Sequence, residues 1–295
     1  MLYDFGGIDE CKSKKPTLYS TNVSESLSTN DNRLCVWNLS TDQVLDNQSS
    51  RNFASSKYFY DTNSEDLKEL ISEIASVRPK LLEKVDLEDE QFVEKELGRM
   101  EGDVAGIIRD ITQDHSKIHE KVVEQKLIIF LHDLAYRTEN PRKEIEMVKN
   151  ATIHHSTQNN IAQAAKDSAK KTQLYYLHGL KPLLDTAHML KEKYDWYIGV
   201  VSGKYKLLIS DDPAKGIRLG FNDICIPISG DLAIIFRAHY TAASYISKDT
   251  PTNGEITLSE RSVFVYNAWQ RICAKRFMFG DKKTIEFIKS KTKNL

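Results

Sequence analysis

The sequence predicts an α+β protein with a small N-terminal β element, a helical middle, and a C-terminal antiparallel or mixed sheet closed by helices. Three observations predict this class. An apolar segment that starts near residue 34 contains a polar break typical of a hairpin. The middle of the chain repeats apolar residues at helical spacing. From residue 195 onward, short β-type runs precede two helical segments.

The N-terminal β element is expected in the stretch "RLCVWNLSTDQVL". Leu34, Val36 and Leu39 lie around Trp37, and the polar "STDQ" break predicts a small hairpin. The spacing of apolar residues then becomes helical, and Ser64 is a good N-cap for the helix that follows. We therefore assign residues 1–62 to an N-terminal β element that packs on the C-terminal part.

Residues 63–194 are expected to form a helical region. Its most apolar helix, "KVVEQKLIIFLHDLAYRT", is predicted to be central. Pro141 suits the first turn of the next helix, where its missing N–H costs nothing. Gly179 and Pro182 are expected to kink or break the long Ala-rich helix that contains them.

Residues 195–295 form the predicted sheet-bearing α+β region. The strand candidates are "DWYIGVVSG", "KYKLLISD", "NDICIPIS" and "DLAIIFRA". Two helical segments follow them, "LSERSVFVYNAWQRICAKRF" and "DKKTIEFIKSKTKNL". This order predicts a sheet that the last helices close.

Composition narrows the classes of function. With 41 Lys and Arg against 42 Asp and Glu, the formal net charge is -1, which argues against a nucleic-acid partner. No apolar run approaches the roughly 20 residues that span a bilayer, and no secretory signal begins the chain. The 4 cysteines are scattered, so a cytoplasmic setting is the simplest interpretation. We expect no cofactor, no metal and no membrane partner.

The stretch "KLLISDDPAKG" contains the most conspicuous polar pair, Asp211 and Asp212. Neighbouring side chains of a strand point to opposite faces, so the two carboxylates cannot share one site while the strand continues. Pro213 restricts Asp212 to extended geometry and ends the strand pairing. We therefore expect Asp212 to be a turn residue and Asp211 to be the carboxylate that faces a cleft.

Glu101, His132 and Arg137 are the other candidate site residues. Together with Asp211 they could line a pocket between the helical and sheet regions, where carboxylates and a histidine would support metal-assisted hydrolysis. A structural interpretation competes with this one. Asp133 and Arg137 have the spacing of an intrahelical ion pair, and His132 would be a half-buried histidine.

A second histidine motif, "HSKIH", places His115 and His119 four residues apart, a spacing that can hold a metal on one helix face. No Glu stands between them as in zinc proteases, and their neighbours are strongly polar. We expect a solvated helix end at this place.

Several segments in chain order resemble a bacterial family, the one numbered 4238 among domains of unknown function. The resemblance spans roughly residues 30–280 and is carried by "RLCVWNLSTDQVLDNQSSRNFASSKYFYD", "LGRMEGDVAGIIRDI", "FLHDLAYRTENPR", "KLLISDDPA", "ICIPIS" and "VYNAWQRICAKRF". Two positions depart from the family pattern. The segment "KPTLYSTNV" lacks the His of the family's His-Tyr-Val-Pro, and Asp212 replaces an Asn. The resemblance implies an architecture and no particular reaction.

Two classes of function stay open. The first is a non-enzymatic protein-interaction role, favoured by the long amphipathic helices and by the aromatic clusters "YFY", "LYY" and "DWY". In this hypothesis the chain forms a homo-oligomer or binds a protein partner, and it inhibits or regulates a bacterial protein in phage–host conflict. The alternative is a metal-dependent hydrolase or nuclease that uses Glu101, His132, Arg137 and Asp211.

Overall fold

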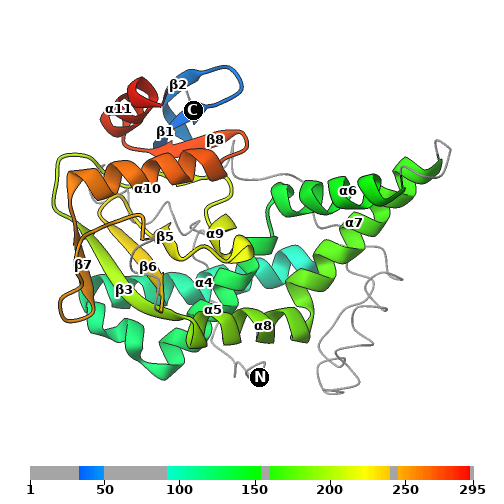
Figure 1. Cartoon of the computed structure of the whole chain (residues 1–295), viewed down its shortest axis with the longest axis horizontal. Coiled ribbons are helices and arrows are strands. Elements are labelled where there is room, and N and C mark those ends of the chain that lie inside the picture. The colour runs from blue at the N-terminus through cyan, green and yellow to red at the C-terminus, as the bar shows by residue number, and fades with distance from the viewer. Residues whose placement is uncertain (1–32, 50–91, 154–159, 240–244, 293–295) are drawn as a thin grey trace.

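The computed structural model describes residues 33–49, 92–153, 160–239 and 245–292. Two four-stranded sheets organise these residues (Figure 1). The smaller sheet has the strand order β2-β1-β8-β4, and the larger sheet has the order β5-β6-β3-β7. The strands of the first sheet are β2 (Gln43–Ser49), β1 (Arg33–Asn38), β8 (Phe277–Gly280) and β4 (Ile209–Ser210). Those of the second are β5 (Asp223–Pro227), β6 (Leu232–Ala238), β3 (Tyr194–Val201) and β7 (Glu255–Leu258).

Helices surround the larger sheet on both faces. The helices before β3 are α4 (Phe92–Gln113), the 3-10 helix η3 (His115–His119), α5 (Lys121–Tyr136), α6 (Glu139–Ile153), α7 (Asn160–His178) and α8 (Leu180–Glu192). Those after it are α9 (Lys215–Leu219), α10 (Glu260–Cys273) and α11 (Lys282–Lys291). Side-chain caps fix several of these starts, because Asp114, Ser259 and Asp281 each accept a backbone N–H of the turn that follows.

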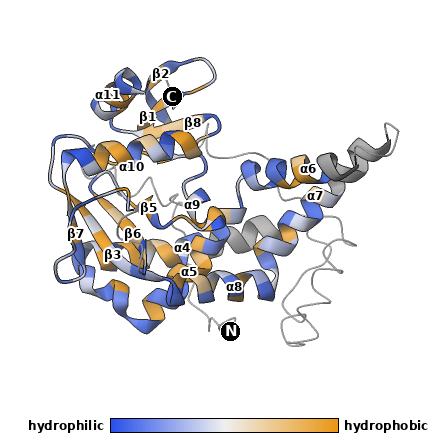
Figure 2. Cartoon of the chain, viewed as in Figure 1, coloured by the Kyte–Doolittle hydropathy of each residue, from blue (hydrophilic) through white to orange (hydrophobic). Residues whose placement is uncertain are grey.

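The main core lies between the larger sheet and helices α4, α5 and α8. Figure 2 shows hydrophobic residues along these strands and helices. Leu127 and Leu131 of α5 are fully buried there, as are Ile198 and Phe236 of the sheet. The most apolar helix is therefore central, as its composition predicts. Helix α10 covers the opposite face of the same sheet, where Val263 and Tyr266 enter a second core cluster.

The two ends of the described chain meet in the smaller sheet. Strand β1 pairs antiparallel with β2 on one side and with β8 on the other, with Trp37 opposite Met278. Helix α11 packs against this sheet and buries Ile285 and Ile288 with Cys35. Residues near the start of the chain and near its end thus share one apolar cluster.

Helices α6 and α7 form an antiparallel pair that extends away from the two sheets (Figure 1). We call this pair the arm. The sequence between α7 and α8 explains why the arm ends where it does. Gly179 has φ -67° and ψ 134°, which is extended geometry, so α7 stops and α8 begins at a new angle.

The predicted fold class is confirmed, and the larger sheet is mixed because β3 runs parallel to β7 and antiparallel to β6. The N-terminal hairpin and the break at Gly179 are confirmed as well. Strands β7 and β8 were not predicted. The expected helix after Ser64 lies outside the described residues. Within the described part of the chain, no helix is long and apolar enough to cross a membrane.

Candidate functional site

Asp211 joins the end of β4 to the turn after α10. Its carboxylate accepts the backbone N–H groups of Lys275 and Arg276, each at 2.8 Å. The Arg276 guanidinium lies 4.0 Å away. Burial raises the pKa of the Asp211 carboxyl, and the accepted N–H groups oppose that rise. Asp211 is therefore a turn-capping residue.

Asp212 is the carboxylate that faces the interior. It is fully buried and makes two parallel bonds of 2.8 Å to the Arg218 guanidinium. The Asn140 amide donates to it at 3.0 Å, and the Thr138 hydroxyl lies at 3.4 Å. Arg218 also reaches Glu144 at 3.2 Å. We call these five residues the junction cluster.

The expected roles of the two aspartates were therefore wrong and are exchanged. Strand alternation holds as far as Ser210, whose buried hydroxyl donates to Gln270 at 2.7 Å. Beyond Ser210 the chain turns, so alternation no longer decides which carboxylate points inward. The inward direction of Asp212 follows from its partner Arg218, which α9 brings back to the same place.

His132 connects three helices. Its Nε2–H donates to the Tyr176 carbonyl oxygen at 2.6 Å, since a carbonyl can only accept, and so the Thr186 hydroxyl donates to Nδ1 at 2.9 Å. Burial lowers the pKa of this imidazole from 6.5 to about 4. His132 is thus a buried neutral residue that fastens α5 to α7 and α8.

Arg137 forms a short ion pair with Glu101 and so joins α5 to α4. The helical spacing instead suggested a partner in Asp133, and no ion pair joins those two side chains. Burial raises the pKa of the Asp133 carboxyl from 3.8 to about 8, and the Arg137 charge only partly opposes this rise. The Arg137–Glu101 ion pair therefore has a structural role, which is to join α4 to α5.

The four predicted site residues do not form one cluster through their contacts. Glu101 and Arg137 touch each other, whereas His132 and Asp211 are each held by other partners. In the ranges that the structure describes, no group of three or more His, Cys, Asp or Glu residues could hold a metal ion.

The junction cluster holds the base of the arm. Asn140, Thr138 and Glu144 belong to α6 or to the turn before it, and all three bind Asp212 or Arg218. The two segments that meet here, "KLLISDDPA" and "AYRTENPR", can each be recognised in the sequence. Arg218 and Asn140 themselves were missed, because nothing local in the sequence pairs them with Asp212.

Gln173 fastens the other helix of the arm to the same place. Its amide donates to the carbonyl oxygens of Tyr136 and Thr138 at 2.7 and 2.8 Å. Its own carbonyl accepts from Arg142 at 2.7 Å, so α6 and α7 are also joined to each other. Farther out, Lys149 donates to the Ser168 carbonyl oxygen at 2.8 Å. These bonds fix the direction in which the arm points.

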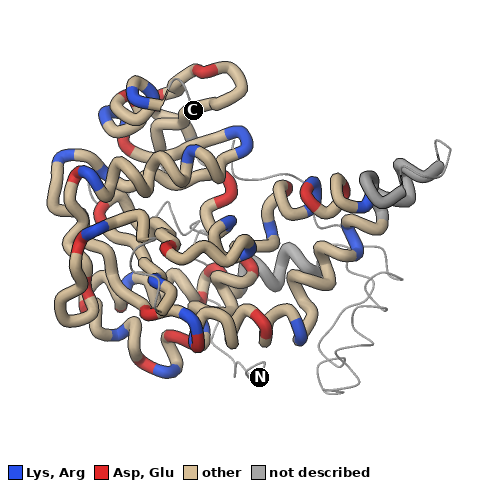
Figure 3. Tube along the Cα trace, in the orientation of Figure 1, with Lys and Arg blue, Asp and Glu red and all other residues tan. Residues whose placement is uncertain are grey.

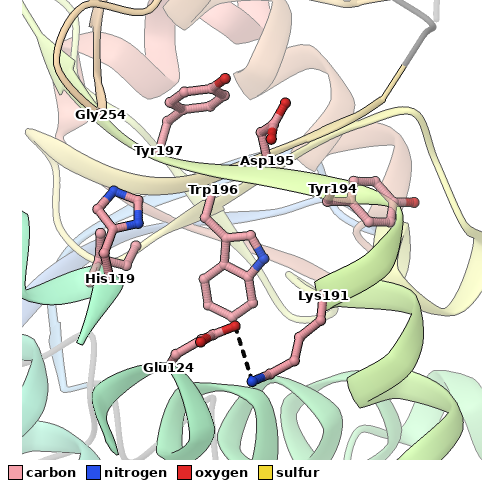
Figure 4. Close-up of a pocket in the computed structure, with 9 residues that line it drawn as sticks. His119, Glu124, Lys191, Tyr194, Asp195, Trp196, Tyr197 and Gly254 are labelled. Carbon is pink, nitrogen blue, oxygen red and sulfur yellow. Dashed lines mark ion pairs between the residues drawn. The ribbon is translucent and has the colours of Figure 1, made fainter. Parts of the chain in front are cut away.

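A hollow of about 330 Å³ lies between the helical region and the larger sheet, and no residue of the junction cluster lines it (Figure 4). It is lined by Ile118, His119, Glu124, Lys191, Tyr194, Asp195, Trp196, Tyr197 and Gly254. None of the four predicted site residues is among them. Of the two histidines of "HSKIH", His119 lines the hollow, and His115 binds Glu255 at 2.9 Å.

These features define a class of α+β protein in which a buried Asp–Arg pair holds a projecting helical hairpin against a mixed sheet. Residues 12–284 match the family described as "Protein of unknown function (DUF4238)", and the chain belongs to this family. The resemblance in the sequence is thereby confirmed. No curated protein and no solved structure matches the chain.

Proposed function

We propose that this protein acts by binding another protein and that the arm is the part that makes the contact. The observation that carries the proposal is the exposure of two adjacent apolar side chains on the arm. Met147 is 71% exposed and Val148 is 68% exposed, both on α6. Methionine is enriched at the centres of protein interfaces, because its flexible side chain adapts to the partner.

The anchoring of the arm supports the same proposal. An element that must order itself on binding loses conformational entropy at that moment, which weakens the complex. The bonds from Gln173 and from the junction cluster already order the base of the arm in the free protein. A fixed, projecting helix pair therefore presents Met147 and Val148 at little further entropic cost.

The partner that we propose is a bacterial protein that the chain inhibits or regulates. We propose also that copies of the chain associate with one another. Charges of both signs are spread over the described elements (Figure 3). Such a distribution favours a protein surface as partner over the continuous negative charge of a nucleic acid.

A hydrolase or nuclease has weaker support. Catalytic side chains need polar atoms free to meet a substrate. His132 has both ring nitrogens bonded inside the protein, and Asp211 accepts two backbone N–H groups. The hollow in Figure 4, between the helical and sheet regions, could receive a small molecule, but none of the four predicted site residues lines it.

Site-specific photocrosslinking tests the proposal. The crosslinking amino acid p-benzoylphenylalanine is placed at position 147 of the full chain, and the chain is expressed in its own host and irradiated. We expect a defined product whose mass exceeds 33.8 kDa by that of one partner, or equals twice 33.8 kDa when the partner is a second copy. The partner is then purified, and binding is measured with the Met147→Lys/Val148→Lys variant. We expect at least tenfold weaker binding.

Val122 provides the matched control, because it is 62% exposed on α5 and lies on the body of the molecule. The crosslinker at position 122 should give no such product, and Val122→Lys should bind as the unchanged chain does. Equal products from both positions, or unchanged affinity of the double Lys variant, would show that the arm is not the interface.

A further inference from the structure

The hollow in Figure 4 extends from the helices that face strand β3 to the edge of that strand. Four consecutive residues of the strand line it, from Tyr194 to Tyr197. Successive side chains of a strand point to opposite faces, and Figure 4 shows Trp196 on one side of the strand with Asp195 and Tyr197 on the other. The side chains of these four residues therefore cannot all point into one hollow. What all four residues can contribute to its lining is their main chain at the edge of the strand.

The hydrogen bonds of β3 show which main-chain groups face this edge. The Lys193 carbonyl accepts from His239, and the Val201 N–H donates to Asp231, so odd-numbered residues face β6. The Ile198 N–H donates to the Gly254 carbonyl, on the side of β7. Directions alternate along a strand, so the N–H and C=O groups of Trp196 also point to the β7 side.

Strand β7 does not extend far enough to meet them. Its pairing with β3 begins with Ile198 opposite Glu255 and ends at Val201. A tight turn at Asn253 and Gly254, both with positive φ, leads the chain away before it reaches the level of Trp196. Within the described part of the chain, no strand lies beside residues 194–197 on this side.

We propose that this edge binds an extended peptide segment of a partner protein, which adds a short strand to the larger sheet beside residues 194–197. An open strand edge presents donors and acceptors at the repeat of an extended backbone, and other proteins use such edges to bind peptides. Four residues of β3 span about 13 Å, which is room for a peptide of similar length.

The walls of the hollow define the side chain that the peptide carries towards the helices. His119 covers the Gly254 end, and its Nε2 would lie 3.1 Å from a Cβ at that glycine. Glu124 and Lys191 form an ion pair of 3.3 Å beneath Trp196. These groups leave little space and offer both a donor and an acceptor. A small polar side chain fits this side of the peptide.

This edge is a second contact surface, separate from the arm. The inference rests on the proposed function in that both require a protein partner, but it uses residues that the arm does not contain. A peptide that binds the edge should therefore bind equally well to the Met147→Lys/Val148→Lys variant. Peptide binding to this variant therefore tests the proposal for the edge independently of the proposal for the arm.

Hydrogen exchange in the free protein is the first test. By NMR on the full chain, the amide of Trp196 should exchange at least tenfold faster than that of Ile198, which is bonded to Gly254. If the two amides are equally protected, the edge is already covered and the proposal fails.

The second test uses decapeptides selected from a random display library on the full chain. A selected peptide should slow the exchange of the Trp196 amide at least tenfold and leave that of Val201 unchanged. Single N-methylation along the peptide should weaken binding tenfold or more at every second residue, because only those N–H groups face β3.

Three results would overturn the inference. They are the absence of any selected binder, binding that leaves the Trp196 amide unaffected, and an N-methyl scan without a period of two. A dimer of 67.6 kDa, twice the 33.8 kDa chain, that the peptide dissociates would assign the edge to a second copy instead of a partner's peptide.

Discussion

Asp211 and Asp212 have identical side chains at adjacent positions. Replacing them should nevertheless lower the free energy of unfolding by different amounts. Asp212 is fully buried with the Arg218 guanidinium against it. Breaking a buried pair leaves a charge without its partner, which is far more costly than the pair's own net contribution. Asp211 accepts two backbone N–H groups near the surface, and loss of such bonds is cheaper.

Asp212→Asn should destabilise the protein by about 3 kcal/mol, because the buried Arg218 charge keeps only the partly exposed Glu144 carboxylate, at 3.2 Å, as an anionic partner. Asp211→Asn should cost about 1 kcal/mol, since the amide oxygen still accepts one of the two N–H groups. Urea unfolding followed by circular dichroism measures both values. Replacing both partners, in Asp212→Leu/Arg218→Met, should recover part of the loss. Equal effects of the two Asn variants would contradict the exchanged roles.

The sequence could single out the segment that contains both aspartates but not the orientation of either. Pro213 and the end of the strand are local features, and they predicted correctly that the chain turns here. The partner of Asp212 in the arm, Asn140, is 72 positions away. An interaction at that separation depends on how helices pack, which local spacing does not contain.

At the scale of elements, the arm and the helix that supports it depend on a few polar contacts. His132 of α5 binds Tyr176 of α7 and Thr186 of α8, so one imidazole holds three helices in register. It does so only while neutral, because burial disfavours the charged form. This contact therefore links the packing of the helices to pH.

The contribution of His132 to the free energy of unfolding should fall as the pH falls from 6.5 towards 4, whereas Asp133, whose pKa burial raises from 3.8 to about 8, contributes the opposite slope. The folded pKa of His132 is lowered from 6.5 to about 4, so the unfolded chain binds the proton first. The lost stability from this group reaches about 3 kcal/mol. Burial lowers the pKa of His178 to about 4 as well, which adds to the slope.

His132→Gln should reduce by about one the number of protons that the chain takes up on unfolding in this pH range. It should also lower the free energy of unfolding at pH 7. Urea unfolding at a series of pH values between 4 and 7 measures the slope of about 1.4 kcal/mol per pH unit for each proton. His188 is exposed on α8 and gives the matched control, His188→Gln. The idea fails if His132→Gln leaves the slope as it was.

Elements with a strong local pattern were predictable, and those defined by distant pairing were not. The hairpin of β1 and β2 and the break at Gly179 follow from local alternation and from one glycine. Strand β8 has four residues and exists because Cys35 to Asn38 lie beside it. A run this short is not distinguishable from a loop until its distant partner is known.

At the scale of the whole molecule, α10 connects the two sheets. Phe264 packs into the cluster of the smaller sheet, and Tyr266 packs into that of the larger sheet. On the same helix, Asn267 binds the backbone of Leu208, and Gln270 binds the carbonyl of Cys225. Polar and apolar contacts on one helix thus join both sheets, which should make them unfold together.

Trp37→Ala tests this coupling. Trp37 is buried in the smaller sheet, and its removal should cost about 3–5 kcal/mol. The chain has 3 tryptophans, so fluorescence of the variant reports only on Trp196 and Trp269, in the larger sheet and in α10. If the sheets are coupled, the midpoint measured by these two residues should fall by about 5–8 °C.

Two probes of unfolding in the Trp37→Ala variant together show whether the two sheets are coupled. Circular dichroism reports on the whole chain, and in a single cooperative transition it should coincide with tryptophan fluorescence. Val122→Ala serves as the control, because this exposed residue lies outside both clusters and its truncation should leave the midpoint nearly unchanged. An early step in circular dichroism, with the fluorescence midpoint of Trp37→Ala unshifted, would instead mean that the smaller sheet unfolds alone and that α10 does not couple it to the rest.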